Sequence, residues 1–118
     1  MANIETSVIT WLESVVGDWP VAGDKPDNPG EKFITIDRTG GPRESMVLDQ
    51  AEILIEVYHK DSQVTASDKA NEIADLIPQL KAYADNITHA SVNSVVNLDD
   101  TIAQYYRYQI YCDIFNRR

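Results

Sequence analysis

The chain has 118 residues and a mass of 13.3 kDa, the size of a single domain over 1–118, because independent domains cluster at roughly 100–150 residues. With 43% hydrophobic and 25% charged residues it can bury one ordinary core, so global disorder is excluded. Its 19 acidic and 10 basic residues give a formal net charge of -9, which argues against tight nucleic-acid binding because phosphates require basic surfaces.

Cysteine content and the N-terminal charge pattern indicate the compartment. The single cysteine, Cys112, cannot form an intrachain disulfide, so the fold needs no oxidising environment. Glu5 and Glu13 precede the first basic residue, Lys25, which is not the pattern of a signal peptide, and no apolar run approaches the ~20 residues of a membrane span. We expect a soluble, unprocessed, intracellular protein that does not bind membranes.

An amphipathic helix is predicted over Asn3–Val16, where apolar residues recur at helical spacing between an N-cap residue, Asn3, and a terminating glycine, Gly17. The next segment, Asp18–Gly30, is rich in proline and glycine and predicts a loop of about a dozen residues. Loops of this length on small domains are functional or fit a partner.

A hairpin is predicted after this loop. Phe33–Asp37 is a short β-rich run, and Leu48–Tyr58 alternates apolar and polar residues as a half-buried strand does. Between them, Arg38–Ser45 contains Gly40-Gly41-Pro42, which favours a turn over a sheet ladder. The two strands are therefore expected to be joined by a projecting loop.

A second helix is predicted from Thr65 to Ala84. Thr65–Asp68 resembles a capping box with Asp in place of the usual Glu, and apolar residues follow at helical spacing. Pro78 removes a backbone hydrogen bond inside this pattern, at a cost of about 3 kcal/mol in an unbroken helix. We expect a kink there, because the apolar register continues beyond the proline.

A second hairpin is predicted from Ser91–Leu98, the turn Asp99-Asp100 and a last strand within Ala103–Asn116. The resulting order α-β-β-α-β-β predicts an α+β fold, in which two helices pack on one face of a mainly antiparallel, four-stranded sheet.

Candidates for acid-base or metal chemistry are His59, His89, Asp37, Asp99 and Asp100. Neither histidine has a partner at the i+3 or i+4 spacing that lets two side chains bind one ion, so both are interpreted as surface histidines. Asp99-Asp100 lacks the alternating acids and terminal Glu of a calcium loop and is interpreted as a solvated turn. We therefore expect no catalytic, cofactor-binding or metal site.

Two further motifs have structural interpretations. Cys112 falls on the core face of the last strand, where burial raises the pKa of a thiol and hides it, so we interpret it as a small hydrophobic residue. Gly40-Gly41 lacks the spacing and the following Lys-Ser or Lys-Thr of a phosphate loop, and we interpret it as a turn.

The last strand carries large groups on both faces. Its aromatic residues are Tyr105, Tyr106, Tyr108, Tyr111 and Phe115. These exceed what the inner face of one small sheet needs, and Tyr and Arg are enriched in interface cores, which favours self-association. The alternative is that Tyr105, Tyr111 and Phe115 lie under the Asp18–Gly30 loop.

Three local strings, in this order and spacing, resemble the tail terminator, or tail-completion, proteins of long-tailed bacteriophages. The first is the strand and Gly-Gly hairpin over Phe33–Gly41. The second is the strand Ala51–Tyr58, which runs into the Ala-rich start of the second helix. The third is the aromatic, Arg-bearing strand Tyr105–Tyr111 that leads to Arg117-Arg118. Two features depart from the family pattern: the acidic, proline-rich Asp18–Gly30 loop, and Pro78 within the second helix.

The resemblance implies a virion protein without enzyme activity or cofactor, assembled in the host cytoplasm. Such a protein forms a ring, usually of six copies, that caps the tail tube, ends its polymerisation and docks onto the head-tail connector protein. Its partners are then further copies of itself, the tail tube protein and the connector. One alternative is another neck or minor tail protein, such as a connector or stopper. A more remote one is a small metal-dependent or acid-base enzyme that uses His59, His89 and the carboxylates.

A closed ring has heterologous contacts, so each subunit presents two different patches. We expect one patch at Arg38, Gly40, Gly41 and Arg43. We expect the other at Tyr105, Arg107, Tyr111 and Phe115. DNA must pass through the ring without sticking, so the pore wall is expected to be acidic, with Asp24, Asp27, Asp99 and Asp100 as candidates.

Overall fold

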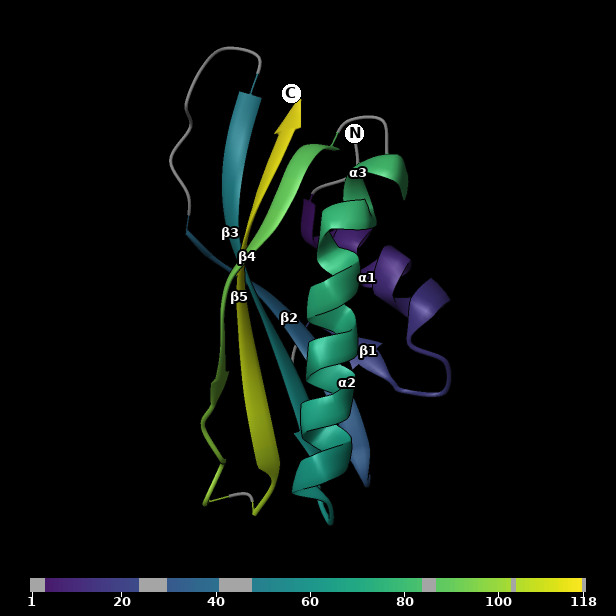
Figure 1. Ribbon diagram of the computed structural model, residues 1–118, viewed down its shortest axis with the longest axis vertical. Coiled ribbons are helices and arrows are strands. Elements are labelled where there is room, and N and C mark those ends of the chain that lie inside the picture. Colours follow the sequence, from purple (N-terminus) through teal and green to yellow (C-terminus); the bar gives the residue numbers. More distant parts are fainter. Residues whose placement is uncertain (1–3, 24–29, 41–47, 84–86, 103, 118) are drawn as a thin grey trace.

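Two helices cover one face of a five-stranded sheet in the computed structural model, which describes residues 4–23, 30–40, 48–83, 87–102 and 104–117 (Figure 1). The elements are α1 (Ile4–Val15), β1 (Val21–Ala22), β2 (Lys32–Gly40), β3 (Leu48–His59), α2 (Gln63–Leu76), the short α3 (Leu80–Tyr83), β4 (Ile87–Asn97) and β5 (Tyr106–Arg117). The predicted α+β class, with its helices on one face, is confirmed.

The sheet has the strand order β1-β2-β3-β5-β4, and neighbouring strands are antiparallel except β1 and β2, which are parallel. The prediction of four strands is therefore wrong, because β1 adds a fifth strand and its parallel pairing makes the sheet mixed; the other three pairings are antiparallel, as predicted. That strand, β1, forms within the predicted loop, next to the point where the Ile34 N–H donates a 2.8 Å hydrogen bond to the Pro20 carbonyl. Two residues are too few to show an alternating pattern in the sequence.

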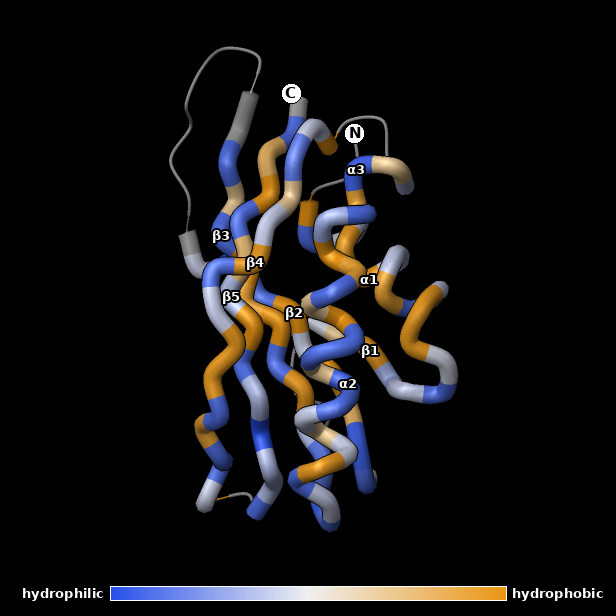
Figure 2. Tube along the Cα trace, viewed as in Figure 1, coloured by the Kyte–Doolittle hydropathy of each residue, from blue (hydrophilic) through white to orange (hydrophobic). Residues whose placement is uncertain are grey.

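The core lies between the helices and the sheet, and hydrophobic residues alternate with hydrophilic ones along the strands (Figure 2). From the helices the buried residues include Ile4, Val8, Trp11, Leu12, Ala66, Ala70 and Ile73. From the central strands they include Ile34, Ile36, Ile53, Ile55, Val57, Ile110, Cys112 and Ile114. Burial raises the pKa of the Cys112 thiol to about 12, which confirms its interpretation as a core residue.

α2 begins earlier than predicted. Its N-cap is Ser62, whose hydroxyl oxygen accepts a 3.1 Å hydrogen bond from the Thr65 N–H. The predicted capping box at Thr65–Asp68 is therefore wrong, because Ser62 supplies the same chemistry three residues before it.

At Pro78, where we predicted a kink, the α-helix is interrupted. The helix passes through a 3-10 turn, Ile77–Gln79, that contains the proline, and continues as α3. Ile77 and Leu80 on either side are fully buried, so the apolar register continues. Within the described part of the chain, no helix is long and apolar enough to cross a membrane.

Candidate functional site

The second face of the sheet, which we call the open face, carries none of the described helices (Figure 1). Strand register aligns its side chains in rows across the sheet, and the central row is Asp37, Leu54, Tyr111 and Ser94. Tyr111 is 37% exposed and Leu54 is half-buried. The row on one side consists of Thr35, Glu56, Gln109 and Val96. The row on the other side includes Glu52, Asp113 and Ser91. The open face thus has a small apolar strip, formed by Leu54 and Tyr111, among polar and acidic side chains.

Polar contacts fix the side chains around this strip. The Gln109 amide donates to the Glu56 carboxylate at 3.1 Å, and the Tyr111 hydroxyl donates to the Gln109 amide oxygen at 3.3 Å. The Arg107 guanidinium forms an ion pair with the same Glu56 carboxylate at 3.4 Å. This network holds the Tyr111 ring on the exposed surface in a defined position, which suits it to contact a partner.

An aromatic cluster of Phe33, Tyr58 and Tyr105 closes one end of the open face. Phe33 stacks on Tyr58 at 4.3 Å between ring centroids, and the Tyr105 ring meets Phe33 edge-on at 5.4 Å. The Tyr105 hydroxyl donates a 2.5 Å hydrogen bond to the Gly30 carbonyl, and burial raises the pKa of Tyr58. The cluster therefore acts as a second small core.

The structure separates the residues that we predicted for one interface patch. Tyr105 is 8% exposed inside the aromatic cluster, and Arg107 contacts both Glu56 and the Leu98 carbonyl. Tyr111 and Phe115 keep accessible ring surface on the open face. The available surface of this patch is thus centred on Tyr111 and Phe115.

The other predicted patch lies at the end of β2. The Arg38 guanidinium donates a 3.4 Å hydrogen bond to the Gln50 carbonyl on β3, and Gly40 ends the strand after a bulge. Gly41 and Arg43 lie outside the described residues, as do the pore candidates Asp24 and Asp27.

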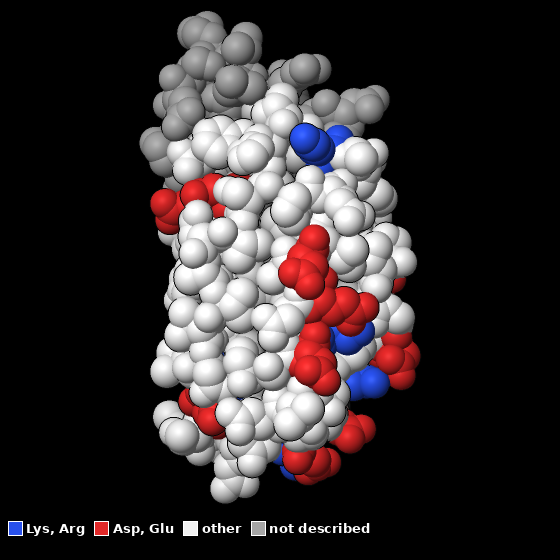
Figure 3. All heavy atoms as spheres, in the orientation of Figure 1, with Lys and Arg blue, Asp and Glu red and all other residues white. Residues whose placement is uncertain are grey.

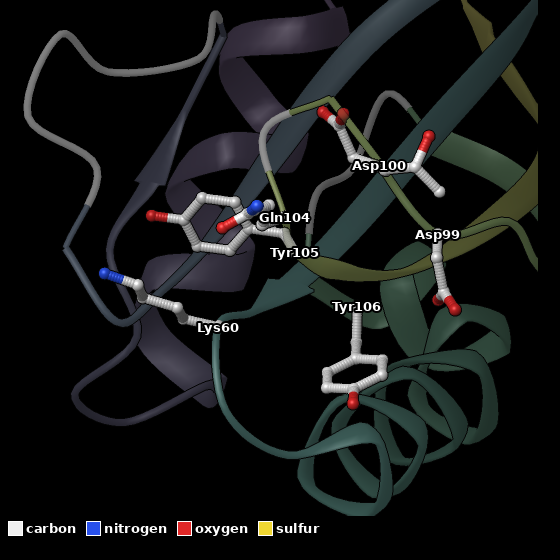
Figure 4. A pocket seen from close by; sticks show the side chains of 7 residues that line it. Lys60, Asp99, Asp100, Gln104, Tyr105 and Tyr106 are labelled. Atoms are coloured by element: carbon white, nitrogen blue, oxygen red, sulfur yellow. The ribbon is translucent and has the colours of Figure 1, made fainter.

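The remaining pore candidates, Asp99 and Asp100, border a shallow pocket at the turn between β4 and β5, together with Lys60, Thr101, Gln104, Tyr105 and Tyr106 (Figure 4). Asp99 accepts hydrogen bonds from the Arg107 backbone N–H and the Asn97 amide. Figure 4 shows the two carboxylates pointing away from one another. They therefore do not converge on one ion, and Asp99 already serves to close the turn.

The two histidines occupy opposite ends of the sheet. His59 pairs with Tyr106 and His89 with Phe115, nine residues further along β5, which is about 30 Å in an extended strand. They therefore cannot act in one site. Among the described residues, no group of three or more His, Cys, Asp or Glu is placed to hold a metal ion.

His59 is buried, so its interpretation as a surface residue is wrong. Its Nδ1 accepts hydrogen bonds from the Asp61 and Ser62 N–H groups at 3.1 and 3.0 Å. It thus shapes the turn that leads into α2. The feature of the sequence that could have indicated this role is the position of His59 shortly before the helix N-cap, Ser62. His89 is exposed beside the Phe115 ring, as predicted.

The sequence matches no protein-family model and no curated protein. Among solved structures, the fold is similar to that of a chain in "Virion of native gene transfer agent (GTA) particle", with a TM-score of 0.66 and 14% sequence identity. The similarity covers 91% of this chain and 84% of that chain. At this identity the likeness is one of fold, and it extends over most of both chains.

Proposed function

We propose that the protein is a structural component of a phage-like virion that acts as a tail terminator. In this role a ring of copies caps the tail tube, ends tube growth and offers a surface to the head connector. The observation that carries the proposal is the exposed Tyr111 on the open face, in a fold shared with a chain of a virion particle. Apolar surface held in place by a polar network is suited to protein contacts.

The arrangement of polar groups favours a structural role over catalysis. His59 accepts two backbone hydrogen bonds, Asp99 closes a turn and Cys112 is buried in the core. Each has a structural partner or position that accounts for its presence. Catalysis requires a nucleophile, acid or base within reach of another reacting group, and His59 and His89 lie too far apart to cooperate.

A ring needs two different patches on each subunit. We assign one to the end of β2 and its following loop, with Arg38, Gly40, Gly41 and Arg43. We assign the other to the region of β5 that exposes Tyr111 and Phe115. Arg107 supports this second patch through its ion pair with Glu56, whereas Tyr105 is packed in the aromatic cluster at one end of the open face.

The charge of the protein suits a channel for DNA. A net charge of -9 on each subunit is multiplied by the copy number, and a negative wall repels phosphates. We propose that acidic and uncharged polar residues line the pore, with Asp24, Asp27, Asp99 and Asp100 as candidates. Duplex DNA added to the assembled ring at about 50 mM salt, where attraction is least screened, should show no micromolar binding. Tight binding that weakens with salt would indicate a basic pore.

The direct test of the function is a tube-growth assay. Purified tail tube protein from the same virion is polymerised with and without this protein, and tube length is measured by negative-stain electron microscopy. We expect added protein to shorten the tubes and to appear at one tube end. A protein that leaves tube length unchanged but binds the portal or connector would instead be a neck connector or stopper.

A further inference from the structure

β4 forms one edge of the sheet and bears none of the charges common elsewhere in the chain. It spans eleven residues, or about 36 Å, and pairs only with β5 among the described strands. It lies within residues 86–98, the longest stretch of the sequence without Asp, Glu, Lys or Arg. In Figure 3 acidic side chains gather over α2, whereas the surface over β4 is largely uncharged.

Such an edge is unusual for a subunit that remains alone. Edge strands expose backbone N–H and C=O groups, and proteins usually protect them with charged side chains, proline or bulges. β4 contains neither charge nor proline, and its protection is limited to bulges between Ile87 and His89 and between Val92 and Ser94. The strand therefore retains the capacity to pair with another strand.

The opposite edge of the same sheet offers a matching strand. Among the described residues, β1 pairs with β2 only at Ile34 and Thr35, so from Ile36 onward β2 itself forms the edge. β2 and β4 run in opposite directions, because three antiparallel pairings separate them. A copy rotated about an axis along the strands would therefore bring its β2 beside β4 in the antiparallel sense.

Charge also favours a second copy as the partner. Subunits of net charge -9 repel one another, so a stable contact needs a seam without excess acid. β4 is uncharged, and the edge segment of β2 carries one acid, Asp37, and one base, Arg38. Their junction has no net charge.

We infer that β4 of one subunit pairs with the edge of β2 in the next, so that the sheet continues around the ring. This inference rests on the proposed ring. Without an axial shift, Asp37 of the neighbour would lie level with Ser94, since both belong to the central row of the open face. The seam also joins the two proposed patches, because Arg38 lies on β2 and Tyr111 lies one strand from β4.

The test replaces two exposed β4 residues in the double variant Ser94→Lys, Val96→Lys. Its matched control, Thr10→Lys, Gln79→Lys, adds the same charge at exposed helix or turn positions. Added positive charge reduces repulsion between acidic subunits, so a loss of assembly would come from the contact surface at β4, and the hydrogen exchange below separates pairing at the edge from contact through the open face. We expect the β4 variant to require a roughly tenfold or higher concentration to assemble, while circular dichroism stays native and the control assembles like the wild type.

A second measurement does not depend on the strand register. Hydrogen exchange of the wild type should slow in β4 and in the end of β2 upon assembly, while β5 is protected in both states. A ring that tolerates the β4 lysines and shows no added β4 protection would overturn the edge pairing alone. A symmetric dimer joined by two β4 strands would also overturn it. A wild type that remains monomeric would overturn the ring, and the pairing with it.

Discussion

Tyr105 lies just before β5 and Tyr111 lies on it, and they should respond in opposite ways to truncation. Tyr105 is 8% exposed within the aromatic cluster, whereas Tyr111 is 37% exposed on the open face. We predict that Tyr105→Ala lowers the free energy of unfolding by about 3–5 kcal/mol, as for other buried aromatic residues. Tyr111→Ala should lower it by less than about 1.5 kcal/mol but shift the assembly toward monomer.

Urea unfolding and sedimentation velocity of both variants provide the two measurements. Phe115→Ser offers a second interface change, because Phe115 is half-buried on the same face. If Tyr111→Ala unfolds the subunit while Tyr105→Ala does not, the assignment of core and surface is reversed and the interface patch is lost.

The buried thiol predicts a dependence of stability on alkaline pH. Burial raises the pKa of Cys112 from 9.0 to about 12, so the folded state holds the proton that the unfolded state releases. This contribution is fully present below pH ~9 and is lost as the pH rises toward 12, by at most about 1.4 kcal/mol per pH unit. The raised pKa of Tyr58 acts in the same direction.

Cys112→Val should therefore reduce the loss of unfolding free energy between pH 8 and pH 10.5, measured by urea denaturation. An identical loss in the variant and the wild type would show that the thiol does not titrate on unfolding. Valine retains an apolar side chain but lacks the 3.4 Å hydrogen bond that the thiol donates to the Ile53 carbonyl, so a difference at pH 8 reports packing and the loss of that bond.

At the level of single residues, the alternation of apolar and polar residues predicted which side chains face the core. It placed Cys112 and Ile110 correctly. It could not show that Tyr105 is covered, because the hydroxyl reaches the carbonyl of Gly30, 75 residues earlier. It also missed the burial of His59, because the three-dimensional path of the turn brings the Asp61 and Ser62 N–H groups to the His59 ring.

At the level of elements, the start of α2 separates two capping hypotheses. Ser62 accepts a hydrogen bond from the Thr65 N–H, whereas the sequence favoured Thr65 itself as the cap. We predict that Ser62→Ala lowers the free energy of unfolding by about 1 kcal/mol, and that Thr65→Ala changes it by less than about 0.5 kcal/mol. Urea unfolding compares the two; a larger effect at Thr65 would place the cap where the sequence suggested.

The elements that sequence predicted well are those with many repeated signals. Both long helices and the four longer strands carry several apolar residues at one period, and the break at Pro78 follows from its missing N–H. β1 was missed because it is defined by pairing with β2 and not by its own two residues. The bulges of β4 are likewise set by the register with β5.

At the level of the whole molecule, charge predicts how salt acts on assembly. Subunits of net charge -9 repel, and salt screens this repulsion over a Debye length that falls from roughly 14 to 4 Å between 50 and 500 mM. We predict that added salt lowers the concentration at which rings form. Sedimentation at 50 and 500 mM salt measures this protein concentration. A ring that dissociates when salt is added would mean that ion pairs between subunits dominate the contact.

The candidate surfaces could be only partly predicted, because they depend on how the helices and strands pack together. The sequence indicated the aromatic last strand and the end of β2 as patches. The fold adds that Tyr111 lies on a face that none of the described helices covers, and that β4 is an edge of the sheet. Neither property can be obtained from residue spacing, since both depend on which faces the helices cover.

The most direct test of the central claim is the mass of the purified protein in solution over a range of concentrations. Mass photometry or sedimentation equilibrium gives the copy number. We predict a closed assembly with one defined mass, about 80 kDa for six copies of the 13.3 kDa subunit. A monomer at every concentration, or growth without a limiting size, would contradict a ring-forming tail protein.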